Sequence, residues 1–167
     1  GINLLDDDDI AGVLMTARDI TDLRQAERLA SSQSEVLELI ARGAPLPEIL
    51  ERCVALVEQK GVDSSSSVYL LEDDRLEMRA GHAPQALNDW VREPPRTPPR
   101  CVCDVAIASG DSAFVPDVAD AAMHDELRSL CEQLGIRAAW SQPIHSASTG
   151  EVVGTLATTY HEPHLPS

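Results

Sequence analysis

Two cysteines separated by one residue, Cys101 and Cys103, are the first candidates for chemistry in this sequence of 167 residues. Thiols at this spacing suit redox chemistry or a share in a metal site. A zinc site would need two further ligands, for which His124, Cys131 and His145 are available, but the sequence has no CxxC pair. The acidic residues nearby are expected to raise a thiol pKa rather than lower it. We therefore predict no metal site, and the simplest interpretation is two small apolar thiols in the wall of a domain.

Three arginines recur at regular intervals in the proline-rich segment REPPRTPPRC, at Arg92, Arg96 and Arg100. Guanidinium groups suit carboxylates and phosphates, so these arginines could meet an anionic ligand. The alternative is that they offset neighbouring carboxylates or face solvent. Trp90 and Trp140 also have two interpretations, either as core residues whose N–H needs a partner or as parts of a pocket wall.

Charge and composition exclude several classes of partner. The chain carries 13 Lys and Arg against 28 Asp and Glu, a formal net charge of -15, which disfavours nucleic acid and direct membrane contact. No apolar run approaches the roughly 20 residues of a membrane-spanning helix, and no leader-like start is present. The four cysteines, of which Cys53 is the first, are too few and too irregularly spaced for a disulfide framework. We predict a soluble, cytoplasmic protein that is a piece of a longer chain.

The elements that would position these residues begin with a strand and a long helix. Residues 10–16 are apolar and β-prone and follow the acidic turn 6–9. A helix then runs from a cap at Asp19 or Thr21 to a stop at Gly43. Its apolar residues recur at the spacing of a heptad seam, which either pairs two copies of the chain or packs on its own domain. The seam consists of Leu23, Ala26, Ala30, Gln33, Leu37 and Ile40.

The rest of the chain predicts strands and helices interspersed around a proline loop. Helices are expected at residues 47–60, 84–91, 103–109 and 123–134, and strands at residues 67–71, 76–80, 113–115, 137–144 and 152–160. Consecutive strands at this spacing pair as hairpins. The sequence therefore predicts an α+β fold, an antiparallel sheet flanked by helices, from about Glu35 onward.

The order of these segments resembles two known families. The stretch INLLDDDDIAGVLMTARDITDLRQAE resembles the C-terminal edge of a PAS domain, with an Arg-Asp-Ile-Thr-Asp exit into a signalling helix. The later chain resembles a GAF domain of the kind that lies between a PAS sensor and an output domain in bacterial signalling proteins. That resemblance rests on LELIARGAPLPEILERCVALVEQ, CVCDVAIASGDSAFVPDVADAAMHDELRSLCEQLGIRAAWSQPI and GEVVGTLATTYHEPHLPS. The final HEPHLPS resembles the point where such domains enter their C-terminal helix.

The resemblance to GAF domains implies a ligand pocket and narrows its possible ligands. Cys103 falls on the cysteine of the family's Gly-Ser-Cys-Gly segment, whereas Cys101 and Asp104 replace glycines. His82 and His124 fall where the fold lines its pocket, so either could ligate haem iron, although no CxxCH motif is present. The bilin attachment cysteine and the signature of cyclic GMP binding are absent, since Phe114 has no Asp-Glu pair at the required distance. The predicted ligand-binding residues are His82, Trp90, Arg100, Cys103, His124 and Trp140.

Three hypotheses for function remain open. The first is a non-catalytic sensory and relay domain in a dimeric bacterial signalling protein, with a PAS remnant at 1–19, a signalling helix at 20–42 and a GAF domain at 35–167. The resemblance implies an output domain that makes or degrades cyclic di-GMP, or a histidine kinase. The second is a dimerisation scaffold without ligand, and the third is a GAF-fold reductase of free methionine sulfoxide. Because its sheet is missing, the strand at 10–16 is expected to be poorly packed or paired with a neighbouring chain.

Overall fold

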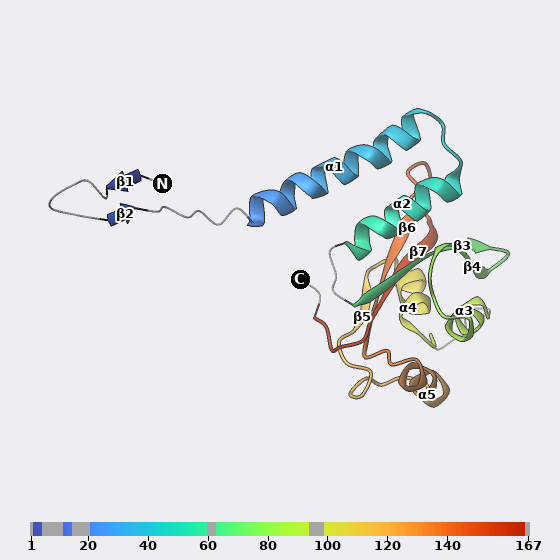
Figure 1. Ribbon diagram of the computed structural model, residues 1–167. Coiled ribbons are helices and arrows are strands. Elements are labelled where there is room, and N and C mark those ends of the chain that lie inside the picture. Colours follow the sequence, from blue (N-terminus) through green and yellow to red (C-terminus); the bar gives the residue numbers. More distant parts are fainter. Residues whose placement is uncertain (1, 5–11, 15–20, 60–62, 94–98, 166–167) are drawn as a thin grey trace. The chain divides into compact units, whose positions relative to one another are not determined.

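The structure is a computed structural model that describes residues 2–4, 12–14, 21–59, 63–93 and 99–165 (Figure 1). The chain divides into two units, Gly1–Glu35 and Val36–Ser167. The first unit holds a hairpin of β1 (Ile2–Leu4) and β2 (Gly12–Leu14), with Asn3 opposite Val13. The expected pairing with a neighbouring chain is wrong, because the first residues of the same chain pair with β2. The expectation that the strand is poorly packed stays a prediction. The outer residues of the predicted strand at 10–16 lie outside the described residues.

Helix α1 (Thr21–Ala41) is a single helix of 21 residues, as predicted. It ends where Gly43 adopts a φ of 70°, and the N–H groups of Gly43 and Ala44 donate to the carbonyls of Ile40 and Leu39. Such a left-handed residue after the last turn is the usual way to close a helix, and glycine adopts it without strain. Of the predicted seam, Ala30, Leu37 and Ile40 are exposed, while the side chains of Leu23 and Ala26 lie outside the described residues.

The second unit is built on a five-stranded sheet in the order β4-β3-β7-β6-β5 (Figure 1). All four pairings are antiparallel, so the predicted α+β fold class is confirmed. The first hairpin turns through Asp73 and Asp74, whose φ values of 47° and 60° match the two-residue turns that suit twisted strands. The strands are β3 (Ser64–Glu72), β4 (Arg75–Gly81), β5 (Ala113–Val115), β6 (Ala138–His145) and β7 (Val152–Tyr160).

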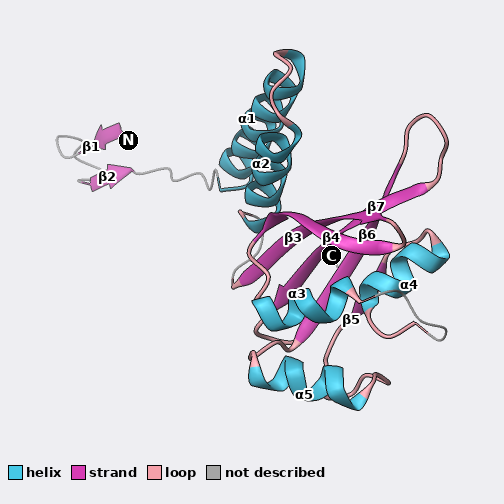
Figure 2. Ribbon diagram, turned by 90° about the vertical axis from the view of Figure 1, so that its right-hand side faces the viewer, coloured by secondary structure: helices cyan, strands magenta, loops and turns pink. Residues whose placement is uncertain are grey.

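One face of the sheet is covered by α2 (Leu46–Glu58) (Figure 2). The helix begins directly after Pro45. A second proline lies within its first turn, where the missing backbone N–H costs no hydrogen bond of the helix. Val54 from this helix is buried against Val68 and Ala80 of the sheet. No described helix is both long and apolar enough to cross a membrane.

The opposite face carries three helices, α3 (Gln85–Arg92), α4 (Val102–Ser109) and α5 (Asp125–Gln133) (Figure 2). Each overlaps the helix expected from the sequence. Two apolar clusters hold these helices to the sheet, one around Tyr69 and Leu76 and the other around Leu127 and Ile136. The space that remains between the helices and the sheet is the candidate site.

Candidate functional site

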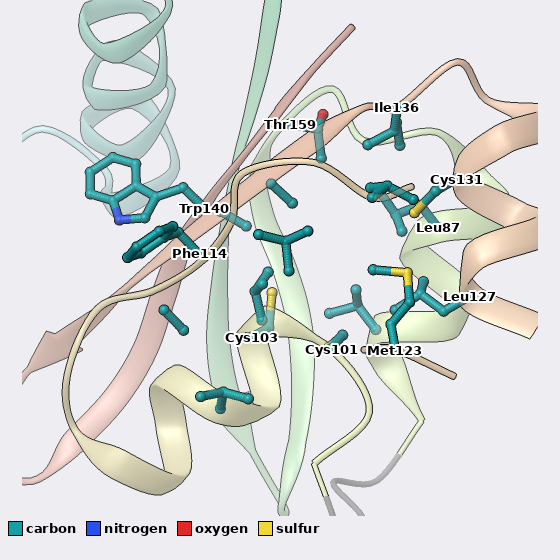
Figure 3. Close-up of a pocket in the computed structure, with 18 of the residues that line it drawn as sticks. Leu87, Cys101, Cys103, Phe114, Met123, Leu127, Cys131, Ile136, Trp140 and Thr159 are labelled. Carbon is teal, nitrogen blue, oxygen red and sulfur yellow. The ribbon is translucent and has the colours of Figure 1, made fainter. Parts of the chain in front are cut away.

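A cavity of about 730 Å³ lies between the sheet and the layer formed by α3, α4 and α5 (Figure 3). This volume is within the usual range for small-molecule sites. Most of the wall consists of aliphatic, aromatic and sulfur-containing side chains, with Leu87 from α3, Cys103 from α4 and Leu127 from α5. The site is therefore assembled from segments far apart in the sequence, and no single motif marks it.

Four of the six residues predicted to bind ligand line this cavity, namely Arg100, Cys103, His124 and Trp140. The other two, His82 and Trp90, are not part of its wall. His82 follows β4 and is exposed, with its backbone N–H directed to the carbonyl of Ser66. The expectation that His82 faces the pocket is therefore not met, although the next residue, Ala83, lines the cavity.

Arg100 lines the cavity, but its guanidinium group is paired with carboxylates of the same chain. Its side chain is 5% exposed, Nη1 donates to Glu93 Oε2 at 2.7 Å, and Nε lies 3.4 Å from Asp104 Oδ2. Arg92 is likewise paired, at 2.8 Å from Glu77, and Arg96 lies outside the described residues. Of the two interpretations of these arginines, neutralisation of neighbouring carboxylates is the one that the geometry of Arg92 and Arg100 favours.

Trp90 is not part of the cavity wall, and its ring lies close to the side chains of Arg100 and His124. The Arg100 guanidinium lies 5.3 Å from the centre of its ring, a cation–π distance, and the His124 ring lies 5.9 Å away at a tilt of 54°. Its indole nitrogen is buried, and no hydrogen-bond acceptor for it is found among the described residues. Trp90 thus supports Arg100 and His124 from outside the cavity.

Trp140 stands at one end of the lining beside Phe114 (Figure 3). Directly paired strand residues share a face, and the register pairs Trp140 with both Phe114 and Thr158. The neighbouring row, Ser141 and Ala157, faces α4. Because side chains alternate along a strand, the row of Trp140 points to the other face of the sheet. Phe114 is 50% exposed, so solvent reaches this row of side chains.

Three cysteines from two helices and the turn before α4 line the cavity, Cys101, Cys103 and Cys131. A hydrogen bond from the Cys103 thiol lowers the pKa of Cys101, while the same contact and burial raise the pKa of Cys103. Burial raises the pKa of Cys131 to about 11. The sequence-based expectation of raised thiol pKa values is thus wrong for Cys101, because local hydrogen bonds outweigh Asp104 there.

Tyr69 also contributes to this site, although the sequence did not identify it as a candidate. Tyr69 is 1% exposed, sits on β3 in the cavity wall, and packs in one cluster with Cys101 and Cys103. Burial is the main cause that raises the pKa of its hydroxyl far above the ordinary value. The alternation of side chains along β3 could have indicated this role, because residues 65, 67 and 69 lie on the same face of the strand.

Within the described parts of the chain, no group of three or more His, Cys, Asp or Glu side chains is arranged to hold a metal ion. His145, offered as a ligand by the sequence, is hydrogen-bonded through both ring nitrogens to the carbonyls of Gly110 and Gly150. For haem, His124 at the cavity rim is a possible axial ligand, whereas His82 lies outside the wall. Of the two histidines predicted as alternative haem ligands, His124 is therefore the one that lines this cavity.

An antiparallel sheet with helices on both faces, and a largely apolar cavity between the sheet and one helical layer, defines a small α+β domain with an internal cavity. More particularly, the chain belongs to the GAF domain family, whose model matches residues 43–166. The resemblance to GAF domains seen in the sequence is thus confirmed. Nothing in this match covers the segment that resembles a PAS domain.

Relatives of this chain include sensors and enzymes. It is 30% identical over 163 residues to the methyl sulfide methyltransferase-associated sensor of Methanosarcina acetivorans, a match over 93% of this chain but only 15% of that protein. A GAF sensor protein from Burkholderia vietnamiensis has a TM-score of 0.63 at 17% identity, covering 84% of this chain and 83% of that one. A type II free methionine-R-sulfoxide reductase from Thermoplasma acidophilum has a TM-score of 0.57 at 15% identity, covering 70% and 75%. At these identities the two structures share the fold alone.

Proposed function

We propose that this GAF domain is a non-catalytic sensory and relay module whose cavity binds a small, largely uncharged molecule. The observation that carries the proposal is the cavity of about 730 Å³, walled mainly by apolar side chains from α3, α4, α5 and the sheet. An occupant would touch all these elements at once. Its arrival or departure would therefore shift how the helices pack on the sheet.

The preference for an uncharged ligand follows from Arg100. Its guanidinium is already engaged by Glu93 and Asp104, so an anionic ligand would have to compete with two carboxylates in a site with little water. Ser67, which also lines the cavity, accepts a hydrogen bond from the Ala83 N–H. A flat or branched apolar molecule with one or two polar atoms suits this wall.

The relay part of the proposal assigns a role to α1. We place a PAS remnant at 1–19, the signalling helix at 20–42 and the GAF domain at 35–167, in a cytoplasmic, dimeric bacterial protein. Leu37 and Ile40 support the pairing of two copies, because they are 65% and 55% exposed. The relative in Methanosarcina acetivorans is named a sensor, which supports a signalling role. The output would be a cyclic di-GMP enzyme or a histidine kinase.

Filling the cavity tests the sensing role. Ala139 lines the cavity from β6, so Ala139→Phe places a ring in the space a ligand would occupy. Ala108→Phe is the matched control, since Ala108 is exposed on α4 and is not part of the wall. Binding of the uncharged dye Nile red is measured by fluorescence, followed by a thermal-shift screen of uncharged metabolites.

We expect the wild type and Ala108→Phe to bind the dye and to be stabilised by the same metabolites, and Ala139→Phe to lose both responses while remaining folded. If the wild type responds to no compound, the dimerisation scaffold becomes the better hypothesis. If Ala139→Phe keeps the response, the binding site lies elsewhere.

The reductase hypothesis has one observation in its favour, the three cysteines in the cavity wall. It requires turnover, which is measured as NADPH consumption with thioredoxin, thioredoxin reductase and free methionine sulfoxide. We expect no consumption above the rate without substrate. Sustained consumption that depends on Cys101 or Cys131 would replace the sensory proposal with an enzymatic one.

A further inference from the structure

The loop between β5 and α5, residues 116–124, contributes to the walls of two hollows. Val118, Met123 and His124 of this loop line the cavity. Four other residues of the loop line a second hollow of about 520 Å³, together with residues 163–165, which follow β7. No described residue lines both hollows. The β5–α5 loop therefore has one set of side chains towards the cavity and another towards the segment after β7.

Arg128 on α5 fixes the loop to that helix. Its Nη1 donates to the carbonyls of Val118 at 2.5 Å and Ala119 at 3.1 Å, and its Nη2 donates to the carbonyl of Ala121 at 2.6 Å. The preceding residue, Leu127, lines the cavity (Figure 3). Because a planar guanidinium holds three carbonyls in a fixed arrangement, a shift of α5 carries this part of the loop with it.

The loop in turn holds the segment that follows β7. The His164 N–H donates to the Pro116 carbonyl at 3.0 Å, and the His164 ring stacks on the Tyr160 ring, with centroids 4.0 Å apart and planes at 11°. The backbone of Arg137 joins the same parts, since its carbonyl accepts the Val118 N–H and its N–H donates to the Tyr160 carbonyl, both at 2.7 Å. A movement of the loop therefore moves the acceptor that holds His164.

The segment after β7, residues 161–165, is held by few contacts. All five of its residues are exposed. Besides the contacts of His164, an anchor is supplied by His161, whose Nδ1 donates to the Gly135 carbonyl at 2.9 Å. Segments with few buried contacts open at a low cost in free energy. A small change at the loop is therefore enough to alter the fraction of molecules in which the segment is docked.

We propose that the 161–165 segment responds to the cavity and docks more tightly on the β5–α5 loop when the cavity is filled. The inference rests on the proposed function, to which it adds a route from the occupied cavity to the end of β7. Loop side chains that face an empty cavity lack contacts on one side, and an occupant supplies them. The ordered loop then fixes the Pro116 carbonyl for His164, so the two events are coupled without contact between ligand and segment.

Ala139→Phe tests the coupling without any ligand. Ala139 pairs with Val115, the residue before the loop, and both line the cavity, so the added ring occupies the space beside the loop. Exchange of the His164 amide proton with water is measured by NMR on the full chain, with Ala108→Phe as the matched control. We expect exchange to slow at least about fivefold in Ala139→Phe, the lower end of usual coupling between sites, and to be unchanged in the control.

Two further measurements separate this coupling from general tightening of the domain. The Gly150 amide, which donates to the Ser146 carbonyl at the other end of β6 and β7, should exchange at the same rate in all three chains. By linkage, His164→Ala, which removes the stacked ring, should bind Nile red more weakly, by up to the factor by which the dye slows His164 exchange. Glu162→Ala is the control and should bind like the wild type, because Glu162 is exposed and lines neither hollow.

Unchanged or faster exchange of the His164 amide in Ala139→Phe would overturn the inference. Equal slowing at Gly150, or an unchanged affinity of His164→Ala for the dye, would overturn it as well. The outcome is separable from that of the sensory proposal. A wild type that responds to neither dye nor metabolite contradicts sensing, whereas the comparison of Ala139→Phe with Ala108→Phe needs no ligand and decides the coupling by itself.

Discussion

At the scale of single residues, the buried pair of Arg100 and Asp104 tests whether the arginine has a structural role. Asp104 is 2% exposed, and its Oδ2 accepts the backbone N–H of Arg100 at 2.9 Å in addition to its ion pair with the guanidinium. Arg100→Met leaves this carboxylate buried without its cation, which we expect to lower the free energy of unfolding by about 3–5 kcal/mol. Urea denaturation followed by circular dichroism measures the change.

The double variant Arg100→Met/Asp104→Leu is the control for this prediction, because it removes both charges together. It should recover much of the lost stability, as apolar replacements of buried ion pairs often do. A loss of less than about 1 kcal/mol in the single variant would mean that Asp104 does not need its cation, and Arg100 would again become a candidate for contact with an anionic ligand.

Asp117 gives a second prediction at this scale, a dependence of stability on pH. The N–H of Ala119, donated at 3.0 Å, and the Arg137 guanidinium at 3.0 Å together lower the pKa of the Asp117 carboxyl. A carboxyl whose pKa is lower in the folded state stabilises the fold above its unfolded pKa and loses that effect as pH falls through the folded value.

Asp117→Asn should therefore unfold at a lower temperature than the wild type at neutral pH, and the gap should close below about pH 4. Differential scanning calorimetry across this range is the measurement. Asp120→Asn is a suitable control, since Asp120 is an exposed carboxyl near the same turn. A gap that persists unchanged in acid would show that the amide disturbs packing rather than charge.

At the scale of elements, helices and strands followed closely from local sequence signals. Proline at the start of α2, and Gly110 and Gly135 with φ values of 72° and 68° after α4 and α5, mark helix ends that residue type alone indicates. The acidic turn at residues 6–9 indicated a hairpin loop before β2, but β1 was not identified as the partner strand, because three residues are too short for a recognisable alternation of apolar and polar side chains.

The candidate site was harder to predict than the elements, and the reason is geometrical. Whether a strand residue faces the cavity depends on register, and a shift of one residue moves a side chain to the other face. Trp140 illustrates this, since its row includes Phe114 and Thr158 rather than Ser141. Tyr69 and the pairing of Arg100 with Glu93 likewise depend on contacts made only after the sheet has formed.

Helix α1 carries the prediction that belongs to this scale. Leu37 and Ile40 are three residues apart on one side of the helix and largely exposed, so their burial would drive association of two copies. We expect Leu37→Glu/Ile40→Glu to raise the dimer dissociation constant at least about tenfold, since each buried aliphatic side chain contributes about 1.5–3 kcal/mol. Sedimentation equilibrium measures it.

Ser31→Glu serves as the matched control, because it adds a charge at an exposed position on the same helix, about two and a half turns before Ile40 and therefore on the opposite side of the helix. Its dissociation constant should equal that of the wild type. If the double variant dimerises as well as the wild type, α1 does not form the interface, and the relay role proposed for it loses its main support.

At the scale of the whole molecule, the division at residue 35 falls within α1, so the last residues of the helix that is proposed to transmit the signal belong to the unit that would detect it. The cavity residues and all five strands of the larger sheet belong to Val36–Ser167. The buried clusters of that unit, around Val54, Tyr69 and Leu127, are likewise made within it. A unit with its own core and site can fold alone.

A shortened chain of residues 43–167 should therefore unfold within a few degrees of the full chain and bind the uncharged dye Nile red with the same affinity, but remain monomeric. The physical reason is that it keeps every residue of the cavity wall and loses the whole α1 seam, Leu37 and Ile40 included. Thermal unfolding, dye titration and sedimentation on the two chains make the comparison. A shortened chain that is unfolded, or that binds the dye much more weakly, would mean that the first unit contributes to the core or to the site, and the separation of detector from relay would be wrong.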